Sequence, residues 1–507
     1  MTRTLRELIL AALLAACASN AAAPAPAAAA AEAAPARPAE AARIGAAWFE
    51  EPAALAGRPD SMKIAPLDLK VPKIETTTLD NGLVVYAVED PSLQLASASL
   101  VLAGGAIYDP ADKVGLASLA AASQRTGGAG DRSADELDDA LDFLAAEIGT
   151  SADQEAVHVD GAALARDFDT LLGMFADVAL RPKFDEARVA IVKARFAEAI
   201  RRRNETPGSI ASRTFAKAVF GEKSPWAREA SLDGIAKLTR GDLVEWHKRV
   251  FQPEGARLVI AGPFPKAELV ARAKAALGGW PKAAAKLPEV ALLDRKLTRR
   301  VILVPKPFAQ AQMRLGHLGY RRHDPDEYAL RLLNDLLGGG GFTSRVTREI
   351  RSNRGLAYSA GSFLTSGKDR GLFGVAMGTE PAKAKEALDV ALDIVTKLAA
   401  GGAIPQSELD ESRDSFVNSF AFRFDTPTRA ASERATLDFY GFPDDYLEAF
   451  RANLGAVTTA AAQDAAKRYI HPDELQIVIV GDPKKLGPLD SLGPVTIVED
   501  PEKPNLP

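Results

Sequence analysis

The side chains that most often hold a catalytic metal are few in this sequence, and their spacing does not suit the task. No two of the five histidines are four residues apart, the spacing that places both rings on one helical face, where they can reach the same zinc ion. The one cysteine, Cys17, lies far from all of them. We therefore expect no catalytic zinc in this chain. The five histidines are His158, His247, His317, His323 and His471.

Cys17 instead ends an amino-terminal targeting segment. Arg3 and Arg6 precede an apolar run, and Leu14-Ala15-Ala16-Cys17 resembles a bacterial lipoprotein cleavage box, with the thiol placed to receive a lipid. A plain secretory signal is the alternative. We expect residues 1–16 to be a signal peptide and 17–65 an alanine- and proline-rich tether. This predicts a periplasmic protein anchored to a membrane by lipid, and the non-acidic Ala18 favours the outer membrane.

Composition excludes other classes of protein. The 507 residues are 47% hydrophobic and 25% charged, as in soluble globular proteins, and they are too many for one ordinary core. The net charge of −5 leaves no basic footprint for nucleic acid. After the targeting segment, no apolar run reaches the roughly 18 residues that a membrane span needs.

A segment near the middle of the chain recurs near its end. The stretches 239–262 and 458–481 each read as a capped amphipathic helix, a proline turn, a buried strand and a glycine stop. The offset is constant, because 458 − 239 and 481 − 262 both equal 219. Thr239 and Thr458 are the expected N-caps. Such a match without gaps indicates a duplicated domain.

Other elements fit this duplication. A capping box at Ser133–Glu136 should begin a helix that ends at Glu147-Ile148-Gly149. Long helices are expected at about 185–203, 381–400 and 407–422, and strands at about 82–88, 97–103, 155–163, 300–304, 312–319, 357–364 and 371–377. Because strands adjoin strands and helices come in blocks, we predict an α+β fold rather than a parallel doubly wound one. The expected units are an amino-terminal half at 66–280, a linker at 281–297, a carboxyl-terminal half at 298–488 and a tail at 489–507.

The stretch from Gly115 to Ala122 is similar to a zinc-binding helix. Pitrilysin/insulinase-type zinc peptidases, including the mitochondrial processing peptidase, carry G-L-A-H-x-x-E-H there, and the flanking Gly104-Gly105 and Gly127 also look like that family. The resemblance covers about residues 70 to 485. It implies a processing-peptidase-like metallohydrolase fold, in which two homologous α/β-sandwich halves form a clamshell.

The zinc-binding side chains of that motif are replaced here. Two histidines bind the metal in the family and a glutamate activates its water, but these positions hold Ser118, Ala121 and Ala122. Glu198 stands about where the family's third ligand is expected, and one carboxylate cannot hold a catalytic zinc. We interpret Glu198 as a helix-surface residue or a relic. The resemblance implies no cofactor in this chain and zinc in a partner subunit.

The second half resembles the family's other signature. A glycine run precedes a helix, and Arg351 leads through Gly355-Leu356-Ala357 to Tyr358, as in the family's Arg and Tyr that face across the chamber. By that match Arg351 and Tyr358 are the catalytic candidates. A Tyr hydroxyl and an Arg cation can stabilise the oxyanion that forms when water attacks a peptide carbonyl. By composition alone, an exposed helix-end cation and an ordinary strand aromatic would be the favoured explanation, and the surrounding match to the family's signature reverses it.

The glycine run is Gly338, Gly339, Gly340 and Gly341. It resembles a shortened form of the substrate-associated loop in the non-catalytic processing-peptidase subunit, which implies contact with substrate. A flexible turn between helices is the alternative. A phosphate cradle is excluded, because no Lys-Ser/Thr follows in the required frame.

Together these features predict a subunit that binds no zinc, contacts a peptide or unfolded polypeptide substrate, and is inactive alone. Its expected partner is a homologous subunit that carries an intact zinc motif. A non-catalytic scaffold or peptide-binding homologue of the same fold is the alternative, and only the Arg351–Tyr358 pair argues against it.

Overall fold

The structure is a computed structural model. It describes residues 73–92, 94–282, 286–290, 293, 295–502, 504 and 506, apart from the side chain of residue 421. The expected signal peptide, Cys17, the tether and part of the linker lie outside the described residues. Within the described ranges, none of the helices combines the length and the apolar composition that a bilayer crossing requires.

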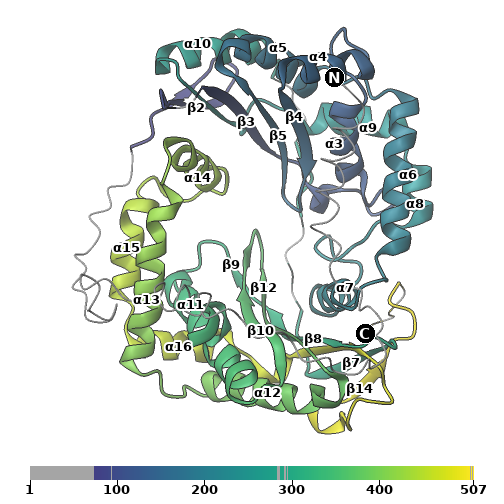
Figure 1. Ribbon diagram of the computed structural model, residues 1–507, viewed down its shortest axis with the longest axis vertical. Coiled ribbons are helices and arrows are strands. Elements are labelled where there is room, and N and C mark those ends of the chain that lie inside the picture. Colours follow the sequence, from purple (N-terminus) through teal and green to yellow (C-terminus); the bar gives the residue numbers. More distant parts are fainter. Residues whose placement is uncertain are drawn as a thin grey trace, which may run out of the picture. The chain divides into compact units, whose positions relative to one another are not determined.

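The first half is built on a six-stranded mixed sheet (Figure 1). Strand β6 lies between β2 and β3 and is parallel to β2, while the other neighbours are antiparallel. Nearly all of β6 is buried because it is central, which explains its uninterrupted apolar sequence. In spatial order the strands are β1 (Thr76–Thr78), β2 (Val84–Glu89), β6 (Arg257–Gly262), β3 (Leu95–Ala103), β5 (Ala156–Leu164) and β4 (Glu147–Ala152).

The second half repeats this sheet. Its strands β7, β13, β8, β12 and β10 stand in the same order as β2, β6, β3, β5 and β4, and only the outermost strand differs. The predicted mixed α/β fold with two sheets is confirmed. In spatial order the strands are β10 (Ala357–Leu364), β12 (Leu372–Thr379), β8 (Ala311–Leu318), β13 (Gln476–Gly481), β7 (Arg300–Pro305) and β14 (Val495–Ile497); a separate pair is β9 (Tyr320–Arg321) with β11 (Ser366–Gly367).

The repeat read from the sequence is a structural repeat. Helices α9 (Arg240–Val250) and α16 (Thr459–Tyr469) differ by the same offset of 219 as β6 and β13. Thr239 accepts a hydrogen bond from the backbone N–H of Asp242, and Thr458 from that of Ala461. Both predicted N-caps are confirmed.

Amphipathic helices bury their apolar faces on one side of each sheet. Helices α5 (Phe168–Leu180) and α10 (Lys266–Leu277) lie on the first sheet, and α3 (Leu116–Thr126) packs beside β4. Helices α11 (Glu327–Asn334), α12 (Ala384–Ala399) and α16 do the same in the second half. Each set forms one continuous apolar core with its sheet.

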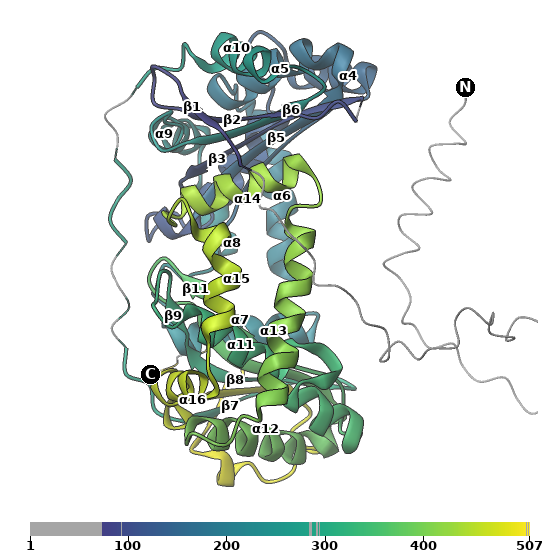
Figure 2. The same ribbon diagram turned by 90° about the vertical axis from the view of Figure 1, so that its left-hand side faces the viewer.

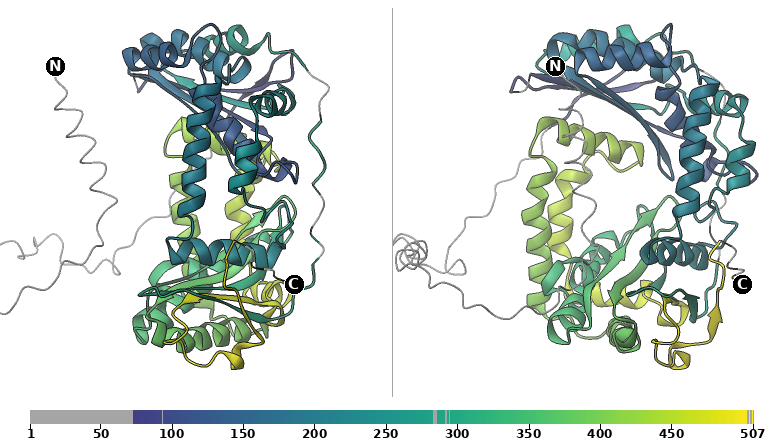
Figure 3. Two further views of the ribbon diagram at one scale, coloured as in Figure 1. Left: turned by 90° about the vertical axis from the view of Figure 1, so that its right-hand side faces the viewer. Right: turned by 45° about the vertical axis from the view of Figure 1, so that its right-hand side comes forward.

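Each half also places one helix on the other half's sheet. Helix α7 (Pro207–Phe220) buries Ile210 and Phe215 against β8 and β13 of the second sheet. Helix α14 (Pro427–Phe439) buries Ala431 and Ala435 against β2 and β6 of the first. In Figure 1, α7 and α14 each lie on one face of the sheet that they contact, and the helices that belong to that sheet's half cover its opposite face. Figure 3 shows the chain passing from α6 into α7.

Helices α6 (Glu186–Arg202) and α13 (Gln406–Phe420), together with α12, confirm the three long helices expected from the sequence. The remaining helices α8 (Leu232–Lys237) and α15 (Tyr446–Ala456) were not predicted. Helix α15 runs alongside α13 (Figure 2).

One expected helix end was wrong. The capping box at Ser133 is present, but α4 (Ala134–Leu144) stops early, because Ala145 adopts a left-handed backbone conformation with φ of 48°. Glu147–Ala152 then forms edge strand β4 instead of the last helical turn. The apolar spacing continued past the helix end, so periodicity alone could not locate it.

The last residues of the chain are tied to α6 and α7. Strand β14 lies parallel to β7 within the segment expected as a tail. Beyond it, Oε1 of Glu502 accepts hydrogen bonds from Arg203, Asn204 and Arg213 at 2.9, 2.7 and 2.9 Å. These donors, Arg203 first among them, lower the pKa of Glu502 to about 2.

This carboxylate should make stability depend on pH. Because folding lowers its pKa from 4.5, its contribution is complete above about pH 4.5 and is lost as the pH falls toward 2. Glu502→Gln should therefore lower the melting temperature at pH 7, and the difference from wild type should narrow below pH 4.5. Thermal melts between pH 7 and 3.5 check this. Glu205→Gln, which removes an exposed partner of Arg202, is the control and should change little.

Candidate functional site

Helix α3 carries the replaced zinc-motif positions. Ala121 is fully buried in the first core, and the hydroxyl of Thr150 donates to its carbonyl oxygen at 2.6 Å. Ser118 and Ala122 are half-buried. The carboxylate of Asp109 caps the start of this helix by accepting hydrogen bonds from the backbone N–H groups of Gly115 and Ala117 at 2.8 and 2.9 Å. Burial raises the pKa of Asp109 to about 6. Helix α3 is thus stabilised by these contacts but carries no histidine.

The remaining carboxylate of the motif does not point to a metal site either. Glu198 on α6 is 58% exposed, and Arg201 donates to it at 3.4 Å across one helical turn. Across the described residues, no group of three His, Cys, Asp or Glu side chains could share one ion. The side chains at the motif positions do not fit a catalytic zinc ion, because Ala121 and Ala122 offer no ligand atom and only Ser118 and Glu198 carry oxygen.

The buried histidines have structural hydrogen bonds. His247 contacts the carbonyl oxygen of Ala179 at 2.8 Å, and burial lowers its pKa to about 4. His317, whose pKa burial also lowers to about 4, accepts the backbone N–H of His471 on Nε2 at 3.0 Å. Folding brings these last two rings within 5.3 Å, which their separation in sequence did not indicate. That N–H already occupies the lone pair that Nε2 of His317 could offer a metal.

Arg351 lies in an unusual helical segment. The π-helix η7 (Thr347–Asn353) carries it, and a second π-helix, η5 (Asp335–Gly339), contains the first two glycines of the run. Such segments are rare and are often found at functional sites. The Cζ atom of Arg351 stands 4.6 Å from the ring centroid of Phe342 and 4.9 Å from that of Tyr358. The structure thus brings the two candidates together in a cation–π contact.

The guanidinium of Arg351 is held in place by rings alone. Its side chain makes no hydrogen bond or ion pair with any described residue. Aromatic faces orient the planar cation without occupying its five N–H donors. Those donors remain available to an acceptor on a ligand.

Tyr358 owes its position to an irregularity in the sheet. Ala357 pairs with Thr379 and Ser359 with the adjacent Gly378, so Tyr358 is the extra residue of a β-bulge. Bulges redirect side chains, and Tyr358 is 80% exposed. Phe342, in the 3-10 turn η6 (Gly341–Thr343) after the glycine run, is 64% exposed on the other side of Arg351.

Arg351 and Phe342 border one groove, which we call the Arg351 groove, and Tyr358 is near it through its contact with Arg351. Three of the four glycines of the run contribute to it, and Arg351 is the only charged side chain among its described lining residues. The lining residues are Gln312, Gly338, Gly339, Gly341, Phe342, Thr347, Arg351, Ser359, Ala360, Gly361, Ser362, Phe363, Ala376 and Met377.

The groove lies along an unpaired sheet edge. Among the described strands, β10 pairs only with β12 in its sheet. Part of the other edge is covered, because the hydroxyl of Thr347 donates to the carbonyl oxygen of Ala360 at 2.8 Å and Gly338 packs on the backbone nitrogen of Ser362. No described strand pairs with the rest of that edge, where an extended chain could add as a strand. An aromatic-flanked cation beside such an edge suits a peptide ligand.

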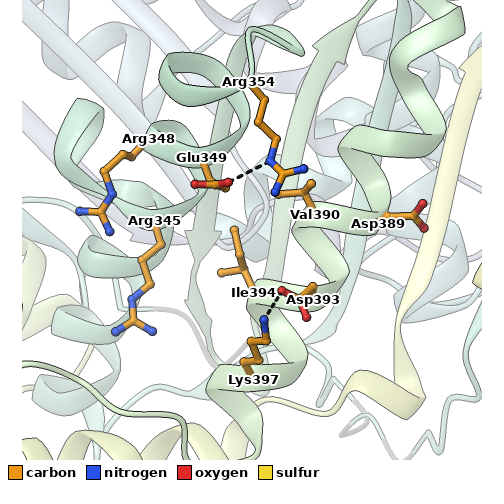
Figure 4. A pocket seen from close by; sticks show the side chains of 9 residues that line it. All are labelled: Arg345, Arg348, Glu349, Arg354, Asp389, Val390, Asp393, Ile394 and Lys397. Atoms are coloured by element: carbon orange, nitrogen blue, oxygen red, sulfur yellow. Dashed lines mark hydrogen bonds and ion pairs between the residues drawn. The ribbon is translucent and has the colours of Figure 1, made fainter.

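A neighbouring pocket shows the opposite arrangement (Figure 4). Its arginines and lysine are already paired with acids. Arg345 contacts Glu408 at 2.6 Å, Arg354 donates to Glu349 at 2.9 Å, and Lys397 contacts Asp393 at 2.7 Å. Arg354 directly follows η7, and the next residue, Gly355, adopts a φ of 59°, a left-handed conformation that favours glycine. These cations stabilise the helices and leave no donor comparable to that of Arg351.

Packing requires glycine most strictly at the first member of the glycine run. A Cβ on Gly338 would overlap the backbone nitrogen of Ser362 on β10, whereas Gly341 faces open space and needs glycine only for its φ of 72°. Gly338→Ala should therefore destabilise the protein by about 1–3 kcal/mol. Gly341→Asn should cost less, because Asn tolerates the left-handed region. Urea denaturation of the two variants compares them, and equal losses would contradict this division of roles.

Phe342 and the bulge at Tyr358 were not anticipated from the sequence. An aromatic residue directly after a glycine run was the available signal for Phe342. No local pattern marks the bulge, since it depends on how β10 pairs with β12.

The chain is similar to known zinc proteases. A family model described as "Peptidase M16 inactive domain" matches residues 237–416. An uncharacterized zinc protease of Streptomyces coelicolor is 27% identical over 277 residues, which are 54% of this chain and 60% of that protein, so the match spans less than two thirds of its length. A probable mitochondrial-processing peptidase subunit beta of Arabidopsis thaliana is 23% identical over 433 residues, covering 82% of this chain and 79% of that one.

A solved structure supports the fold. A peptidase M16 inactive domain from Pseudomonas fluorescens superimposes with a TM-score of 0.75 at 24% identity, covering 82% of this chain and 99% of that one. The two sheets, the internal repeat and these likenesses agree. Residues 237–416 match the model of the peptidase M16 inactive domain, and the chain is similar to uncharacterized zinc proteases and to a processing-peptidase β subunit.

Proposed function

We propose that this chain is the substrate-contacting subunit of a two-subunit zinc peptidase and binds no zinc itself. The observation that carries the proposal is the half-buried guanidinium of Arg351, which contacts two exposed rings and has no hydrogen-bond acceptor among the described residues. A cation so oriented costs free energy unless a ligand uses its donors. The same chain offers no usable metal donors on α3.

The substrate is an extended peptide or an unfolded segment. Its backbone lies along β10, while the Arg351 groove takes side chains. Arg351 donates to the carbonyl oxygen of the scissile bond and orients it. The hydroxyl of Tyr358, directed outward by the bulge, donates to the oxyanion that forms on attack by water.

The partner is a homologous subunit with an intact zinc motif. Zinc bound in that subunit would supply the activated water, a chemistry that Ser118, Ala121 and Ala122 cannot support. Because cleavage needs both the activated water and the oxyanion contacts, neither subunit alone should cleave well. The amino-terminal sequence supports a periplasmic complex with a lipid anchor at Cys17, and Ala18 favours the outer membrane.

Reconstitution tests the proposal. The purified chain is mixed with a homologous subunit that carries H-x-x-E-H, and cleavage of a fluorogenic unfolded peptide is followed. Activity should rise well above that of either subunit alone and disappear with a chelator. Stoichiometric zinc and chelator-sensitive cleavage in the lone chain would overturn the proposal. Assembly without any gain in cleavage would favour the scaffold role instead.

A further inference from the structure

A second arginine, Arg314, lies near the Arg351 groove without being one of its lining residues. On β8, Met313 and Leu315 face the core beneath α11 and α12, so Arg314 between them faces the opposite side of the sheet. Its Cζ atom stands 5.6 Å from the ring centroid of Phe363, which lines the groove. Ala376, directly opposite Arg314 on β12, lines it too. The side chain therefore reaches across β12 toward the groove.

The sheet leaves room for this reach. A Cβ on Gly374 would stand 2.7 Å from Cζ of Phe363, so the ring lies over that glycine on β12. The neighbouring residue along this face of β12 is the small Ala376. A larger residue at either position would close the path between β8 and β10. The small side chains thus let a cation anchored on an inner strand serve the groove at the sheet edge.

Arg314 is charged, half-buried and unsatisfied. Burial lowers its pKa, and its side chain makes no hydrogen bond or ion pair with a described residue. Most half-buried arginines of this protein are paired: Arg213 with Glu229, Arg322 with Glu155 and Arg345 with Glu408. The groove itself has no acidic lining residue. A site with two free guanidinium groups and no carboxylate is complementary to an acidic ligand.

We propose that Arg314 is a specificity residue that binds an Asp or Glu side chain of a peptide lying in the Arg351 groove. This rests on the proposed function, in which the groove takes an extended peptide along β10. In such a strand every second side chain faces the same side of the sheet, which is the side of Arg314 and Phe363. Arg351 serves the peptide backbone, and Arg314 selects the acidic residue.

Matched peptides test this inference. Two fluorescently labelled, otherwise neutral extended peptides, one with a single Glu and one with Gln in its place, are titrated with the full chain and followed by anisotropy. The Glu peptide should bind about tenfold more tightly at low salt, as expected for one charge-assisted pair. Arg314→Gln should abolish that ratio while leaving the Gln peptide unaffected. Arg166→Gln, which removes an arginine with a 79% exposed side chain, is the control and should keep the ratio.

Two further variants guard against a folding defect. Arg314→Lys keeps the charge but loses the paired donors, so it should retain only part of the preference. Arg314→Glu should reverse it in favour of a peptide with Lys at the same position. A preference that survives Arg314→Gln, or equal binding of both peptides to the wild type, overturns the role of Arg314 and leaves the peptide groove standing. If neither peptide binds the wild type, the proposed function fails as well.

Discussion

Arg351→Ala should lower the kcat of the reconstituted peptidase by about a hundredfold, the loss that follows removal of one oxyanion donor. Tyr358→Phe keeps the ring that stands 4.9 Å from the guanidinium and removes only the hydroxyl. This variant should therefore lower kcat in the same way. Both interactions strengthen as charge develops on the substrate oxygen, and kcat should therefore fall more than KM rises. Steady-state kinetics of the mixed subunits measures this.

The matched control lies on the same turn of chain. Arg348 faces the neighbouring pocket, where Glu408 pairs with it at 3.3 Å, so Arg348→Ala should leave cleavage close to wild type. Assembly with the partner must be unchanged in each variant. Wild-type rates in both Arg351→Ala and Tyr358→Phe would remove the catalytic role and leave the scaffold interpretation.

Glu155→Gln should destabilise the protein by about 3 kcal/mol, the usual cost of leaving one charge of a buried pair without its partner. Glu155 in the first half accepts two hydrogen bonds from Arg322 in the second, at 3.0 and 3.1 Å, and each side chain is only 13% exposed. The Cζ atom of Arg322 also stands 3.8 Å from the ring centroid of Tyr440. Removing the carboxylate leaves this guanidinium buried and unpaired.

Thermal melts and urea denaturation measure the effect. Glu198→Gln is the control, because its pair with Arg201 is exposed and should be worth less than about 1 kcal/mol. Replacing both partners, Glu155→Leu with Arg322→Met, should recover much of the loss, since no charge is then left buried. Equal shifts in Glu155→Gln and Glu198→Gln would show that the contact between the halves contributes nothing special.

Local sequence features predicted most of the framework. Thr239, Thr458 and Ser133 were identified as N-caps because capping involves residues within one turn. The duplication was visible because its apolar spacing repeats without gaps. Helix α4 was predicted too long, since its apolar spacing ran on past the left-handed Ala145. Strand β14 was missed because three residues with mixed exposure carry too little pattern.

Helices α7 and α14, which each pack on the sheet of the other half, were also not predicted from the sequence. Thr206-Pro207 and Thr426-Pro427 begin α7 and α14 at nearly the same offset as the recognised repeat, so a signal existed in the sequence. What it could not reveal is that each helix packs on the sheet of the other half. That choice depends on contacts between residues far apart in the chain.

The sequence by itself determined which chemistry this chain lacks and that it contains two related halves. A side chain's capacity to bind zinc resides in its own atoms, so Ser118, Ala121 and Ala122 carry that information without a structure. Only the tertiary structure decided that a bulge sets Tyr358 beside Arg351, that Arg314 lies near Phe363 of the groove, and that Glu155 meets Arg322. These features arise from strand pairing and long-range packing, in which the position of each group depends on residues that are distant in sequence.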